Sequence, residues 1–157
     1  MNQVHIITPM GEVLYEVLKT VANFVSQLPG GAKQYPEAVI SHNDYHLLET
    51  FWAEATHEIR SLLTPYIVES QANNNQQETN INNALQLTLT LPNNWKPETL
   101  QKPLEQAIKN YALQLIQKAW FTNISPETGE IFSRKVTVAK LAVQFLLYRK
   151  QTDTPKN

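Results

Sequence analysis

The residues of this chain whose types and spacing could support chemistry are histidines and glutamates between positions 42 and 57. The candidates for a metal site are His42, His46, Glu54 and His57. On one helix, His42 and His46 would share a face, because they are four residues apart. Glu54 and His57 have the Glu-x-x-His spacing of carboxylate-bridged di-iron bundles, but a second such pair is missing.

The helical periodicity around these residues argues against a metal site. Di-iron ligands must face the interior of a bundle. When Trp52 is placed at the centre of the apolar seam, His46 and His57 point more than a quarter turn away, toward solvent. We therefore interpret them as part of a solvated polar face and predict neither a metal nor a cofactor. A metal-dependent enzyme built on these residues remains our third hypothesis.

Other catalytic patterns are missing from the sequence. The chain has no cysteine, no Gly-x-Ser-x-Gly segment and no glycine-rich phosphate loop, and it contains only four glycines. Pairs of glutamates can be chosen on any helix, and their ordinary role is solubility. We predict a protein without catalytic residues, which is not an enzyme.

Composition and charge narrow the class of protein. A chain of 157 residues with 42% hydrophobic and 17% charged residues is typical of one globular domain. It has neither an apolar run long enough for a membrane span nor the pattern of a secretory signal, so we expect a cytoplasmic or virion protein. Residues 1–83 carry three basic residues and nine acids, whereas residues 84–157 carry ten basic residues and five acids. That asymmetry fits a nucleic-acid face, head-to-tail assembly, or charges balanced within the fold.

The segment from position 85 to position 121 changes its period in the middle. Leucines at alternate positions predict a strand with one apolar face, at Leu85, Leu87, Leu89 and Leu91. Pro92 and two asparagines end it, and a helix begins at Pro97 or Pro103. The apolar stripe of that helix is broad enough to predict contacts on two sides. The strand needs a partner, which is either residues 4–7 of the same chain or the edge of a neighbouring subunit.

Three further helices complete the prediction of a mainly α, four-helix bundle-like single domain, spanning 1–157, with a minor β element near 84–91. The first follows Thr8 and Pro9, with Thr8 as a cap, and ends at Gly30 and Gly31. The second starts near Ser41–Asp44, and Pro65 should either kink it or end it near Thr64. Residues 70–83, rich in Asn and Gln, read as a flexible loop. Residues 122–135 suggest a turn before a fourth helix, whose face carries Val138, Leu141 or Ala142, Phe145 and Tyr148.

The aromatic residues mostly occupy positions compatible with a core, Phe145 and Tyr148 among them. Trp95 differs, because it lies in a polar turn before a helix. It is interpreted either as a hydrophobic staple onto that helix or as an anchor in a subunit interface. With the strand leucines it gives our predicted interface, formed by Leu85, Leu87, Leu89, Leu91 and Trp95.

The second half of the chain resembles a set of small proteins carried in prophages and mobile elements of gut Bacteroidetes, among virion structural genes. The resemblance is carried by the Leu-x-Leu-x-Leu-Pro-x-Asn-Trp series from Leu87 to Trp95 and by the residues that follow it. These are Leu100, Leu104, Ala107, Tyr111, Ala119, Trp120 and the closing Tyr148-Arg149-Lys150. The resemblance implies a non-enzymatic, ring-forming head–tail connector or neck component, and it brings no catalytic residues.

Our first hypothesis is therefore a structural protein that acts by assembly with copies of itself or with other virion proteins, and not in a membrane. The alternative is a helical regulatory protein of a mobile element that binds a peptide or nucleic acid with its basic second half. The basic residues are spread along the helices rather than clustered, so nucleic acid is the weaker partner.

Overall fold

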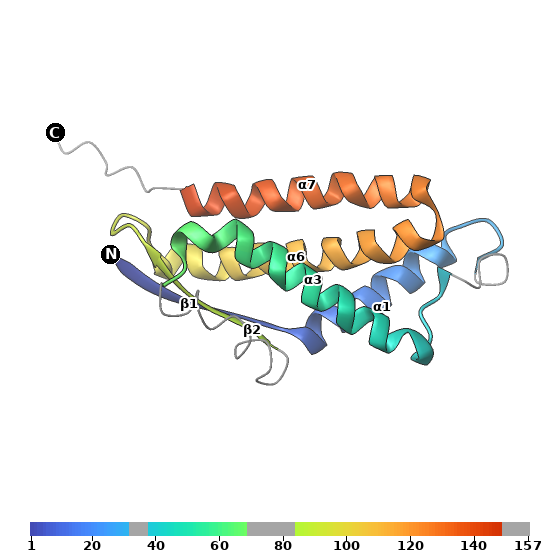
Figure 1. Cartoon of the computed structure of the whole chain (residues 1–157). Helices are drawn as coiled ribbons and strands as arrows, with labels where there is room; N and C mark the ends of the chain where they lie inside the picture. Colours follow the sequence, from blue (N-terminus) through green and yellow to red (C-terminus); the bar gives the residue numbers. More distant parts are fainter. Residues whose placement is uncertain (32–37, 69–83, 149–157) are drawn as a thin grey trace.

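The computed structural model describes residues 1–31, 38–68 and 84–148, and Figure 1 shows their arrangement. Within these residues the chain forms four α-helices, two short 3₁₀ helices and a two-stranded antiparallel sheet. The predicted fold class, a mainly α single domain with a minor β element, is confirmed. The loop predicted at 70–83 lies outside the described residues.

The strand predicted at 85–91 is β2, Ala84–Leu91, and its partner belongs to the same chain. It pairs antiparallel with β1, Asn2–Pro9, in a register that places Val4 opposite Leu89 and Ile6 opposite Leu87. The second edge of β2 is also engaged, because Ile67 forms a bridge with Leu89 and the Val68 amide donates to the Thr88 carbonyl. Of the two partners considered for the strand, residues 4–7 are the one found.

The N-terminal strand leads directly into helix α1, Met10–Ser26. Val4, Ile6 and Thr8 alternate with exposed residues and point into the core. The predicted cap at Thr8 is wrong, because Thr8 lies within β1 opposite Leu85, and the N-cap position is Pro9, which makes no side-chain cap. The predicted end of the helix at Gly30 and Gly31 is wrong, because α1 ends at Ser26 with Gln27 as its C-cap. Gly30 and Gly31 do adopt the positive φ angles expected of them, 86° and 56°.

Helix α3, Tyr45–Leu63, begins and ends where its sequence indicates. It follows a 3₁₀ turn, η2, His42–Asp44, closed by a capping box between Ser41 and Asp44. The helix ends before Pro65, which lies in the following 3₁₀ turn η3, Thr64–Tyr66. Proline has no backbone N–H to donate to the next turn of an α-helix. The predicted seam faces the core, since Leu48, Trp52, Ala55 and Ile59 are buried.

Helix α6, Pro97–Ile124, is the central element of the fold. It begins at Pro97 and carries Pro103 inside its N-terminal part. It contacts α1, α3, β1 and the last helix, α7, so the predicted contacts on two sides are confirmed. None of the helices in the described residues is long and apolar enough to cross a membrane.

Helix α7, Pro126–Tyr148, corrects the prediction of a turn at residues 122–135. Only Ser125 separates it from α6, and Pro126 occupies the first helical position, where proline is tolerated. Gly129 serves a close approach between the helices rather than a turn. A Cβ atom there would lie 2.5 Å from Thr122 Oγ1 and 2.9 Å from Thr122 Cα. Pro126 and Gly129 are evident in the sequence, but these two residue types are compatible both with a turn and with the start of a closely packed helix.

Candidate functional site

The histidines and the glutamate considered for a metal site lie on or before α3, and all four are exposed. His42 lies in η2, outside the helix, whereas His46, Glu54 and His57 lie on α3 itself. The solvent-facing orientation predicted for His46 and His57 is confirmed. Within the described residues, no three His, Asp or Glu side chains come together as a group that could hold a metal ion.

The residues predicted as an interface are all buried inside the chain itself. Leu85, Leu89 and Leu91 are fully covered, and Leu87 and Trp95 are nearly so. The strand is covered because it packs into the core and has a neighbour along each edge. These side chains therefore offer no free surface to a second chain.

Trp95 connects the turn before α6 to the C-terminal end of α7 by a hydrogen bond. Its indole N–H donates to the Leu146 carbonyl over 2.8 Å, and its backbone carbonyl accepts from Asn2 Nδ2 over 2.7 Å. Neither of the two interpretations considered for Trp95 included this contact with α7. The residue helps to place the face of α7 that packs on α6.

A groove runs between α3 and α7, with α6 as its floor; we name it the α3–α7 groove. Its main part has a volume of about 930 Å³. A smaller hollow of about 280 Å³ shares Glu58, Tyr111 and Lys140 with it and extends it to Pro65 and Gln144. The edge-to-face contact of Tyr66 and Tyr148, with ring centroids 6.5 Å apart, links the two sides near this end.

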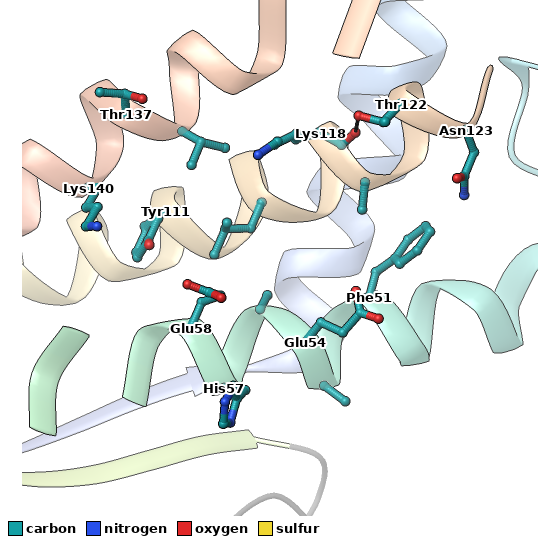
Figure 2. Close-up of a pocket in the computed structure, with 15 residues that line it drawn as sticks. Phe51, Glu54, His57, Glu58, Tyr111, Lys118, Thr122, Asn123, Thr137 and Lys140 are labelled. Carbon is teal, nitrogen blue, oxygen red and sulfur yellow. Dashed lines mark hydrogen bonds between the residues drawn. The ribbon is translucent and has the colours of Figure 1, made fainter. Parts of the chain in front are cut away.

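The two walls of the groove differ in charge. Figure 2 shows Glu54 and Glu58 on the α3 side, and Lys140 on α7 with Lys118 on α6 across from them. Glu58 is directed toward Tyr111 on the floor, whereas His57 points away from the other lining side chains. Burial, and secondarily the charge of Glu58, raise the pKa of the Tyr111 phenol. The phenol therefore keeps its proton to a higher pH than that of a free tyrosine.

The most unusual surface lies on α7, on the side turned away from α6. In Figure 1, α7 lies beside α6 as an outer helix. We name its exposed apolar side the α7 stripe, formed by Ile131, Val138, Leu141, Phe145 and Tyr148. Val138, Phe145 and Tyr148 are each about two-thirds exposed, at 67%, 65% and 65%. The expectation that Phe145 and Tyr148 belong to the core is therefore wrong.

The stripe was visible in the sequence, but its exposure was not. Val138, Leu141, Phe145 and Tyr148 follow steps of three and four, as a core-facing seam does. A second set on the same helix has compatible spacing and is buried instead, consisting of Phe132, Ala139, Val143 and Leu147. Two apolar seams on one helix indicate two surfaces that can be buried, and the surrounding elements decide whether both are covered within the chain.

Comparison with protein-family models, with curated proteins and with solved structures gives no match for this chain.

Proposed function

We propose that this chain is a non-enzymatic assembly protein that associates with copies of itself through the α7 stripe. The observation that carries the proposal is the exposure of Val138, Leu141, Phe145 and Tyr148 on one side of a well-packed helix. Monomeric proteins rarely leave a contiguous apolar surface of this kind in water, and such patches mark interaction sites. Covering it would stabilise a complex by roughly 25 cal/mol for each Å² of apolar surface removed from water.

The spacing of the stripe fits a helix as its partner. Steps of three and four residues from Val138 to Tyr148 give the narrow seam by which helices pack side by side. Phe145 and Tyr148 supply aromatic side chains, the kind that dominates binding energy at interfaces. The resemblance of the second half of the chain to prophage-encoded proteins supports a narrower role, that of a head–tail connector component assembling in the host cytoplasm or in a virion.

The test is the mass of the protein in solution, measured by light scattering behind a sizing column over a hundredfold range of concentration. The single chain has a mass of 17.9 kDa, and we expect the measured mass to rise above this value with concentration. Phe145→Asp should weaken the association by about tenfold or more, because it places a charge in the buried centre of the interface.

Tyr15→Asp is the matched control. Tyr15 is also an aromatic residue on a helix and is 61% exposed, against 65% for Phe145, but it lies on α1, outside the stripe. It should leave the association unchanged. A wild-type protein that stays at the mass of one chain throughout, or equal losses in both variants, would overturn the proposal.

A further inference from the structure

We infer that the α7 stripe of one copy docks into the α3–α7 groove of the next, so that each chain carries one donor and one acceptor surface. The inference rests on the proposed function, because it names the place where the stripe binds. It commits to a head-to-tail contact between copies, in contrast to a symmetric pairing of two α7 helices.

The stripe and the groove use different sides of the same helix. Val136, Thr137 and Lys140 line the groove, whereas Val138 and Leu141 belong to the stripe. Neighbouring residues of a helix point about 100° apart, so the stripe cannot turn into the groove of its own chain. Both surfaces are therefore available at the same time, and a second copy can meet each of them.

The groove has apolar side chains that can cover the stripe. The floor and walls include the apolar side chains of Phe51, Leu115, Ala119 and Val136. The groove and its extension run from Phe51 to Pro65 along the α3 side, which at 1.5 Å per residue is about 20 Å. The part of the stripe from Val138 to Tyr148 needs about 15 Å on the same basis, whereas Ile131 would lie beyond the end of the groove. The acceptor is thus long enough for this part of the donor.

The charges beside the stripe are opposite in sign to those of the α3 wall of the groove. From Ile131 to Tyr148, α7 carries Arg134, Lys135 and Lys140 and no acidic residue. By helical geometry, the exposed Arg134 lies within the stripe, between Ile131 and Leu141. Lys135 borders the stripe on one flank, and Thr137 and Gln144 border it on the other. In the groove, the α3 wall is acidic through Glu54 and Glu58, and neither forms an ion pair within the described part of the chain.

These charges also fix the orientation of the docked helix. Its Lys135 flank would lie toward Glu54 and Glu58, and its uncharged flank toward Lys140 of the receiving chain. The opposite orientation would bring Lys135 against Lys140, and like charges at an interface are strongly unfavourable. A contact of this kind uses two different surfaces, so each bound copy leaves a free groove at one end and a free stripe at the other. Repetition then gives a closed ring or a filament.

The experiment is complementation between two variants of the full chain. Phe145→Asp breaks the stripe and keeps the groove, whereas the double variant Glu54→Lys/Glu58→Lys reverses the groove charge and keeps the stripe. All three positions are exposed, so the fold should tolerate these changes. We expect each variant alone to have the mass of one chain, and the equimolar mixture to form a pair of chains that does not grow further.

Glu49→Lys/Glu98→Lys is the control for net charge. It changes the charge by the same amount at two exposed acids that do not line the groove. It should assemble like the wild type. Assembly of Glu54→Lys/Glu58→Lys at wild-type strength, while Phe145→Asp is monomeric, would overturn the inference and leave the proposed function standing. Two monomeric variants that do not combine when mixed would also overturn it. Unchanged assembly of Phe145→Asp would overturn the proposed function itself.

Discussion

Helices α6 and α7 follow one another with a single residue between them, yet they use their apolar side chains differently. Both carry apolar residues on more than one side. In α6 these sides are covered by α1, α3, α7 and β1, so that Leu104, Ile108 and Ile116 are fully buried. Helix α7 packs chiefly against α6, and only the side with Phe132, Ala139, Val143 and Leu147 is buried.

The difference shows what apolar periodicity can and cannot tell. A pattern around a helix indicates how many surfaces it could bury, but the surrounding elements decide how many are covered within the chain. In α6 the second apolar side contributes to stability. Among the described residues, the second apolar side of α7 remains exposed to water, which is energetically unfavourable.

The largest expected effect on the free energy of unfolding comes from comparing one substitution, Leu→Ala, on the two helices. Leu104→Ala in α6 should lower the free energy of unfolding by about 2–5 kcal/mol, because it leaves a cavity in a fully buried site. Leu141→Ala in α7, at a residue that is 58% exposed, should change it by about 0.5 kcal/mol or less. Denaturant unfolding at a concentration where the protein is monomeric measures both values. Similar losses for the two variants would break the comparison, because Leu141 would then be part of the monomer core.

A smaller effect tests how closely α6 and α7 approach. Gly129→Ala should destabilise the protein by about 1–3 kcal/mol, because the new Cβ atom would meet the Thr122 side chain and backbone. Gly11→Ala on α1 is the matched control, since no atom lies within 4 Å of the Cβ position and alanine favours a helix by up to about 1 kcal/mol. Thermal unfolding of both variants should give shifts of opposite sign. A stabilising Gly129→Ala would contradict the close approach of α6 and α7 at this position.

Much of the fold follows from local patterns in the sequence. The alternation of Leu85 to Leu91 and the change to a helical period after Pro97 each have one physical interpretation, because a strand has a period of two and a helix has a period of 3.6. Pro65 indicates a kink or an end of the helix, because proline in a helix interior removes a backbone hydrogen bond. The solvent-facing side of α3 could be predicted in the same way, because a single clear seam fixes where His46 and His57 point.

The features that could not be predicted depend on contacts between residues that are distant in the sequence. The junction of α6 and α7 was mispredicted because Pro126 and Gly129 suit either a turn or the start of a tightly packed helix. The exposed side of α7 was mispredicted because two seams on that helix satisfy the same period. The groove could not be predicted at all, since it is defined by the placement of α3 and α7 on either side of α6. No local pattern contains that spacing.

The smallest effect concerns the end of the α7 stripe, where Tyr148 meets Tyr66 of η3. Burial, followed by a hydrogen bond and a charge interaction with Tyr148, raises the pKa of Tyr66 from 10.0 to about 12. The folded protein thus keeps the proton that the unfolded chain loses near pH 10. This contribution to stability is fully present below pH 10 and is lost as the pH rises from 10 to 12.

The phenolate absorbance of the folded protein, compared with that of Tyr66→Phe, isolates the titration of Tyr66. Tyr148→Phe should lower the pKa of Tyr66 toward 10 without reaching it, because burial is the larger cause. That result would make Tyr148 the one member of the stripe tied to another element of its own chain, and leave Val138, Leu141 and Phe145 as the part open to a partner. If the pKa of Tyr66 is the same in the presence and absence of the Tyr148 hydroxyl, Tyr148 is as free as Phe145. The uncovered side of α7 would then extend to the end of the helix.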